Sequence, residues 1–322
     1  NENAEKAYEE RYRFVYDAMK AKYPDLVYFA DLSYYRMPAG TPCWSRICRT
    51  SFTTPQRRTE EDHTMDTDRK QQFLRLWEKY FPGAELPITF YYTDEAGSVE
   101  SAKPAAGHRC IFADLARVRA GKPLRFDVQS VGCFGGKRYT GFSNAAMPNF
   151  EFFLSCGIPG KLEGERYKKT PELVKEWVGQ VPEFRAPARF IVFKRWDLLE
   201  EVDTPDVAIF FAGPDVLSGL FTLANFDVAQ PNGVFVPFGA GCASTIQYPY
   251  LESRSASPRG VLGLFDVSAR PFVSPDTLTF SVPMNKLQQM IDNMDESFLT
   301  TESWNRVRKR IGTSQTKRVP DK

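Results

Sequence analysis

The sequence predicts a mixed α/β fold: a sheet built from two β-α-β-like repeats, preceded by a helical N-terminal extension. The order strand, helix, strand, glycine-cysteine turn occurs twice along the chain. Helical crossovers join parallel strands, so this order indicates at least some parallel pairing. Hydrophobic residues make up 42% of the 322 residues, which is enough for a large core. We therefore expect an α/β domain with two related halves.

The N-terminal extension covers residues 1–86. Apolar and aromatic residues near helical spacing predict a helix over residues 3–22. Residues 38–66 are rich in proline, threonine and charge and show little periodicity, so we expect a long loop there. A second helix is predicted over residues 68–80, because apolar and aromatic residues share one of its faces. The Pro82-Gly83 pair is expected to end it.

The first repeat covers about residues 87–142. It begins with a short strand over residues 87–92 and continues with a helix over residues 110–119. A strand over residues 124–131 leads into a glycine-rich turn that carries Cys133. Glycine allows backbone conformations with positive φ and lets another group approach closely, so such a turn suits a binding site.

The second repeat covers about residues 187–265 and has the same order of elements. An apolar strand over residues 205–211 is followed by a helix over residues 214–226. A strand over residues 233–238 then leads into a second glycine-rich turn, which carries Cys242. Residue identity between the two copies is slight, so the repeat is predicted from the order of elements alone.

The remaining elements are predicted from shorter patterns: strands over residues 150–154, 190–193, 260–265 and 277–282, and helices over residues 170–178 and 283–294. Thr170 is the predicted N-cap of its helix, with Pro171 at the first position. Negative charge is unfavourable at a helix C-terminus, so we expect the last helix to end near Asn293, before Asp295. Residues 305–322 are predicted to form a basic, partly disordered tail.

Composition narrows the classes of function. Lys+Arg 42 against Asp+Glu 40 leaves a net charge of +2, which does not favour nucleic acid as a partner. The most apolar region, residues 207–229, is interrupted by polar residues and Pro214, so no membrane span is expected. Six scattered cysteines are too few for a disulfide scaffold. They are typical of a reducing compartment, and we expect the protein to be cytoplasmic.

Five motifs carry a resemblance to a known family: HRCIF (108–112), VGCFGGKRY (131–139), FGAGC (238–242), LGLFDVSARP (262–271) and NMDESF (293–298). Together they resemble the uncharacterised archaeal and bacterial family catalogued as domain of unknown function 169. The resemblance runs from about Pro87 to about Trp304 and implies a family domain over residues 87–304. It draws attention to Cys110, Cys133 and Cys242, and it implies no particular reaction.

These three cysteines are the candidate metal ligands. If Cys110, Cys133 and Cys242 converge, they can hold an iron-sulfur cluster or another thiolate-bound metal and leave one coordination position open. No Cys-x-x-Cys pair supports this hypothesis. A second interpretation is a reactive thiol, because His108 and Arg109 precede Cys110 and can lower the pKa of a nearby thiol. A third is that all three are ordinary buried residues. Outside this set, Cys43, Cys48 and His63 show no pattern of a site.

Basic residues suggest a small anionic ligand. Lys137 and Arg138 follow the first glycine-rich turn, where free backbone N–H groups can also gather. Arg270 is a second candidate anion clamp, because a guanidinium can bind a carboxylate in two places. Its structural alternative is an ion pair with Asp266.

Three hypotheses of function follow. The first is a cytoplasmic metal- or iron-sulfur-binding protein with a redox or small-molecule role, in which Lys137, Arg138 and Arg270 orient an acidic substrate. The second is a metal-free binding module for a small anionic metabolite. The third is a cysteine-dependent enzyme.

Overall fold

The computed structural model describes residues 66–95, 97–104, 107–145 and 147–314, all within one compact unit. The helix predicted over residues 3–22 lies outside the described residues, as do nearly all of the loop predicted over residues 38–66 and the three residues Cys43, Cys48 and His63.

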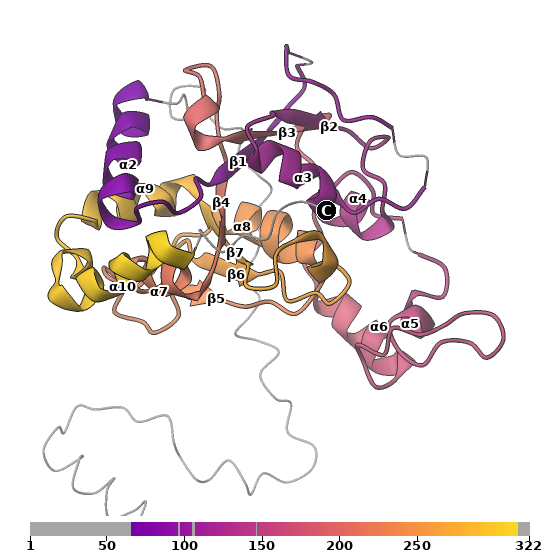
Figure 1. The fold of residues 1–322 in the computed structure, drawn as a ribbon. Helices are drawn as coiled ribbons and strands as arrows, with labels where there is room; N and C mark the ends of the chain where they lie inside the picture. Colours follow the sequence, from indigo (N-terminus) through magenta and orange to yellow (C-terminus); the bar gives the residue numbers. More distant parts are fainter. Residues whose placement is uncertain (1–65, 96, 105–106, 146, 315–322) are drawn as a thin grey trace, which may run out of the picture. The chain divides into compact units, whose positions relative to one another are not determined.

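A mixed sheet forms the centre of the described unit (Figure 1). Its seven described strands have the order β2-β3-β1-β4-β7-β6-β5. Neighbouring strands are antiparallel except β5 and β6, which are parallel. The strands are β1 (Ile88–Thr93), β2 (Leu124–Phe126), β3 (Phe190–Arg195), β4 (Val207–Ala212), β5 (Val234–Phe235), β6 (Gly260–Gly263) and β7 (Leu278–Pro283).

Helices connect these strands and cover the sheet. They are α2 (Thr67–Tyr80), α3 (Ile111–Arg119), α4 (Phe134–Tyr139), α5 (Phe150–Phe153), α6 (Pro171–Gln180), α7 (Pro214–Ala224), α8 (Tyr248–Glu252), α9 (Met284–Asn293) and α10 (Glu302–Ser314). None of the described helices is long and apolar enough to cross a lipid bilayer. The predicted mixed α/β class is confirmed.

The predicted repeats differ from the simplest β-α-β arrangement. The helix α3 joins β1 to β2, but β3 lies between these two strands in the sheet. Because β1 and β2 are both antiparallel to β3, they run parallel to each other across it, which is a split β-α-β unit. In the same way, β7 and β6 separate β4 from β5. The duplication of two halves stays a prediction.

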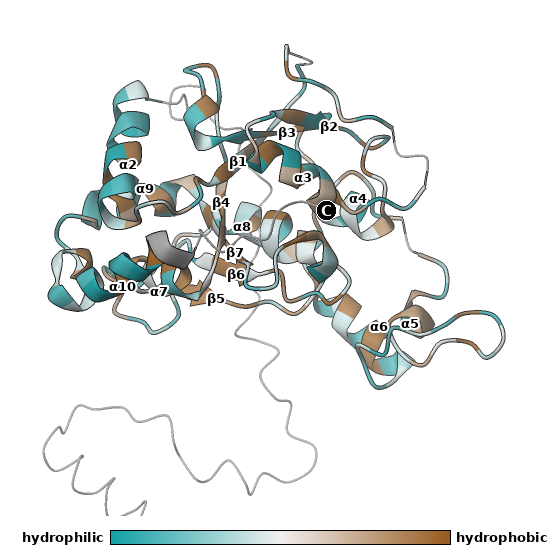
Figure 2. Cartoon of the chain, viewed as in Figure 1, coloured by the Kyte–Doolittle hydropathy of each residue, from teal (hydrophilic) through white to brown (hydrophobic). Residues whose placement is uncertain are grey.

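The sheet has a hydrophobic core on each face, because successive strand side chains point to opposite faces. Along β4, one core receives Ala208, Phe210 and Ala212, and the other receives Val207, Ile209 and Phe211. The first core also contains side chains of α2, α7, α9 and α10. The second contains side chains of α3 and of the segment that follows Cys242. Figure 2 shows hydrophobic residues along β1 and β4, whereas α10 is mostly hydrophilic.

Helix α2 packs against the rest of the described unit through its aromatic face. Phe73 and Trp77 are buried in the first core, where the Phe73 ring lies 4.4 Å from that of Trp196. At the end of α2, the Asp295 carboxylate accepts hydrogen bonds from Lys79 (2.6 Å) and Tyr80 (2.5 Å). This explains the acidic residue after α9, which ends at Asn293 as predicted.

Several predicted strands are wrong in extent or type; the strand predicted over residues 233–238, for example, is only the two-residue β5. The segment predicted as a strand over residues 150–154 is the helix α5, which follows Asn149 in the left-handed region (φ 58°). A short apolar run does not distinguish a strand from a helix turn, and this caused the error. The strand predicted over residues 124–131 ends at Phe126, because the Asp127 carboxylate accepts hydrogen bonds from the backbone and hydroxyl of Ser130 and forms a turn.

Part of the segment predicted as a basic tail is helical. Residues 302–314 form α10, and Trp304 is buried against α2. Its indole Nε1 donates a hydrogen bond to the Tyr80 carbonyl at 3.0 Å. Most residues of this helix are charged or polar, and this composition predicted a solvated segment. The buried Trp304 ring holds the helix against the first core.

Candidate functional site

A cavity of about 790 Å³ lies beside α3 and α4, on the face of the sheet that carries the second core. Four segments far apart in the sequence line it: residues 108–112, 133–139, 147–178 and 237–269. The lining is mainly apolar, which is typical of small-molecule sites. Its aromatic members are Phe112, Phe134, Tyr139, Phe150, Phe153, Tyr167, Trp177, Phe238 and Phe265.

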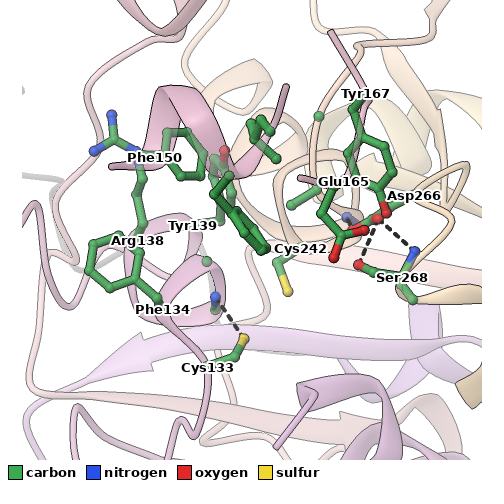
Figure 3. Close-up of a pocket in the computed structure, with 18 of the residues that line it drawn as sticks. Cys133, Phe134, Arg138, Tyr139, Phe150, Glu165, Tyr167, Cys242, Asp266 and Ser268 are labelled. Atoms are coloured by element: carbon green, nitrogen blue, oxygen red, sulfur yellow. Dashed lines mark hydrogen bonds between the residues drawn. The ribbon is translucent and has the colours of Figure 1, made fainter. Parts of the chain in front are cut away.

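Cys133 occupies the position just before α4. Its sulfur accepts a hydrogen bond from the backbone N–H of Gly136 at 3.0 Å (Figure 3). A Cβ atom at Gly136 would lie only 2.8 Å from that sulfur, so glycine is needed for this close approach. The glycine-rich sequence after Cys133 is thus the first turn of a short helix, and it holds the thiol in the cavity wall.

Cys242 precedes a turn of π-helix over residues 243–247. Such turns occur frequently at functional sites. The Cys242 side chain is only 5% exposed, and its sulfur points into the cavity (Figure 3). The preceding Gly241 donates its N–H to the Asp266 carboxylate at 2.9 Å. The second glycine-rich turn is therefore fastened to the loop that follows β6.

The half-buried Cys110 precedes α3 and lines the same cavity. The structure thus brings together the three cysteines that the sequence singled out. Among the described residues, however, no group of three or more His, Cys, Asp or Glu side chains is arranged to hold a metal ion. The cysteines are also free thiols, with no disulfide among them.

All three thiols have raised pKa values, and burial is the largest cause. Burial, with smaller contributions from Cys133 and Asp266, raises the pKa of Cys110 to about 11. The pKa of Cys242 is raised well above its ordinary value by burial and then by the other two cysteines. The neighbouring Arg109 is ion-paired with Asp114. In this structure the thiols are therefore protonated near neutral pH, which does not favour a reactive thiolate.

The predicted basic residues do not all reach the cavity. Arg138 lines it, and its side chain makes no hydrogen bond or ion pair with any described residue. Lys137 and Arg270 do not belong to the lining. The Arg270 guanidinium instead donates to the backbone carbonyls of Ser274, Pro275 and Thr277, so the alternative pairing with Asp266 is not formed either.

An acidic group at one end of the cavity was not predicted. Glu165, Tyr167, Asp266 and Ser268 lie together there, away from Arg138 (Figure 3). Asp266 accepts hydrogen bonds from the backbone N–H (3.0 Å) and hydroxyl (2.8 Å) of Ser268. Burial, and then the charges of Asp266 and Glu165, raise the pKa of the Tyr167 hydroxyl, which therefore stays a hydrogen-bond donor. Glu165 and Tyr167 lie in a charge-rich stretch with no motif, so no signal in the sequence marked them.

The fold and the cavity define a mixed α/β protein with a thiol-bearing, aromatic-lined pocket. The chain belongs to the family catalogued as domain of unknown function 169 and described as an uncharacterised ArCR, whose profile matches residues 84–293. Neither the curated proteins nor the solved structures contain a match.

Proposed function

We propose that this protein binds an iron-sulfur cluster through Cys110, Cys133 and Cys242, with a redox or small-molecule role. The observation that supports the proposal is that three cysteines from three distant segments line one cavity. Three protein ligands leave one position open, and here the rest of the cavity would face that position. Aromatic surroundings would limit access of water, which is one of the factors that set the potential of a cluster.

We propose a cluster rather than a single metal ion, because a cluster tolerates donor sulfurs that stand farther apart. A tetrahedral ion with bonds of about 2.3 Å needs donor sulfurs roughly 3.8 Å apart. No group of described side chains is arranged to hold a single ion. In a [4Fe–4S] cluster, each thiolate binds a different iron, so the donor sulfurs stand farther apart. The four described cysteines are free thiols. We propose that the protein is cytoplasmic, because the cytoplasm keeps thiols reduced.

The test is purification without oxygen, followed by a visible spectrum and by iron and sulfide analysis of the same sample. We expect a brown protein with iron and acid-labile sulfide. The variants Cys110→Ser, Cys133→Ser and Cys242→Ser should each lose most of the iron. Cys156→Ser is the matched control, since Cys156 is a free and exposed cysteine outside the cavity lining, and it should keep its iron. A colourless protein with every thiol titratable would contradict the proposal.

A metal-free binding module for a small anion is the second candidate. It is favoured by Arg138, which belongs to the cavity lining and whose guanidinium makes no hydrogen bond or ion pair with any described residue. A guanidinium in such a position suits a carboxylate or phosphate. This alternative predicts that an anionic ligand raises the melting temperature, that the rise survives replacement of the cysteines, and that Arg138→Ala abolishes it.

A further inference from the structure

We infer that the Asp266 end of the cavity binds a ligand with a positively charged, N–H-bearing nitrogen group attached to an aromatic or apolar body. The inference concerns the cavity described above but does not require a cluster in it. It goes beyond the proposed function because it names the charge and shape of the ligand.

Charge is the first argument. Glu165 and Asp266 both line the cavity, and neither forms an ion pair with a cation among the described residues. Elsewhere in the lining, Glu151 does have such a partner, because Lys175 lies 3.4 Å away. Asp266 is half-buried, and a half-buried carboxylate gains more from a cation than one in open water, since the local dielectric constant is lower. The two carboxylates would repel an anion at this end.

The aromatic lining is the second, independent argument. The faces of aromatic rings attract cations, and several rings together form cages for ammonium groups. Two rings of this cavity already show the preference: the Lys168 Nζ lies 4.2 Å from the centre of the Phe238 ring and 5.9 Å from that of Trp177. Phe238 and Phe265 are about half exposed (50% and 52%), so a planar ligand can reach them from solvent.

The inner wall gives the third argument. Cys242 is almost fully buried, and its sulfur points into the cavity without a hydrogen bond to another described residue (Figure 3). A buried thiol packs as a small hydrophobic group, so this part of the wall suits the apolar body of the ligand. Ser268 already donates to Asp266. The second carboxylate oxygen is held by Gly241, so the carboxylate has a fixed orientation toward an incoming N–H donor.

The experiment compares three probes of equal size: benzamidine (cationic), benzamide (neutral) and benzoate (anionic). The full chain, purified without oxygen, is titrated with each probe by calorimetry, and its iron content is measured on the same sample. We expect benzamidine to bind at least tenfold more tightly than benzoate, with benzamide in between. Equal or tighter binding of benzoate would overturn the inference, and so would the failure of all three probes to bind.

Variants then locate the binding site. Glu165→Gln and Asp266→Asn should each weaken benzamidine binding about fivefold to tenfold and leave benzamide binding nearly unchanged. Glu163→Gln is the matched control, since Glu163 is an exposed glutamate two residues away and outside the lining. Glu165 is itself exposed, so its variant is expected to fold normally even if Asp266→Asn loosens the turn at Gly241. Unchanged benzamidine binding in Glu165→Gln and Asp266→Asn would place the probe elsewhere and refute the inference. If the protein contains no iron and still binds benzamidine, the proposed iron-sulfur cluster is refuted and the inference of a cation site stands.

Discussion

At the scale of single residues, Gly241 shows how closely the cavity wall is packed. A Cβ atom there would lie 2.8 Å from a ring carbon of Phe112 and 3.2 Å from side-chain carbons of Leu264 and Ala269. These neighbours are core residues, so they have little freedom to move. The glycine is therefore required by packing, and not by a left-handed backbone conformation.

We predict that Gly241→Ala destabilises the protein by about 1–3 kcal/mol, the usual cost of overpacking a core. Gly179→Ala serves as the control, since Gly179 lies in α6 with nothing within 4 Å of an added Cβ. That variant should stabilise the protein by about 0.5–1 kcal/mol, because alanine is the better helix former. Urea unfolding at 25 °C measures both. Equal midpoints for the two variants would show that the space around Gly241 is not restrictive.

At the scale of elements, the Arg195 side chain connects the end of β3 to the end of α3 and forms an ion pair with Asp197. The Arg195 guanidinium donates to both oxygens of Asp197 (2.6 and 2.8 Å) and to the carbonyl of Arg119 (3.1 Å). These hydrogen bonds from Arg195 are the main reason that the pKa of Asp197 is lowered. Both side chains are less than one-third exposed, so solvent only partly screens the pair.

This pair makes a prediction about pH. A carboxylate whose pKa is lowered by folding contributes stability above its unfolded pKa, and this contribution is lost as pH falls through the lowered folded pKa. We expect Asp197→Asn to cost about 1 kcal/mol at pH 7, between the value of an exposed ion pair and that of a charged hydrogen bond. The difference from the wild type should shrink below about pH 4 and disappear in stronger acid. Thermal unfolding across this pH range measures it, and a difference independent of pH would exclude the charge as its cause.

At the scale of the whole described unit, the Trp304 side chain and the candidate site lie on opposite faces of one sheet. Trp304 anchors α10 on the first core, where its ring lies 5.2 Å from that of Phe81. The three cysteines line a cavity on the side of the second core. The strand residues between these cores point alternately to each, so a loss of packing on one face leaves the other face supported.

We predict that Trp304→Ala lowers the free energy of unfolding by about 3–5 kcal/mol, as is usual for removal of a buried tryptophan. The content of the proposed iron cluster per folded molecule, and the proposed affinity for benzamidine, should stay within twofold of the wild type. Denaturant unfolding gives the first quantity, and metal analysis and calorimetry give the others. Loss of both ligands at a temperature where the variant is still folded would show that the two faces are coupled.

How much of this could be predicted from the sequence depended on the length of each pattern. The helices α2, α3, α6, α7 and α9 were all predicted, because their apolar residues recur at helical spacing and Thr170 caps α6 through its hydroxyl. Patterns of only a few residues were less informative, as the error at α5 shows. Strand order was beyond local patterns, since β3 inserts between β1 and β2 after a long connection.

The candidate site divides in the same way. The sequence by itself determined the class of the fold, the family and the three cysteines, because glycine next to cysteine is a local signal and the five motifs stand in the chain in order. Only the tertiary structure decided that the cysteines share a cavity, that Arg270 binds backbone carbonyls, and that Glu165 joins Asp266 opposite Arg138. The physical reason is that a local pattern reports how a residue suits its own segment. A cavity depends on which distant segments pack side by side, and that is set by the order of strands in the sheet.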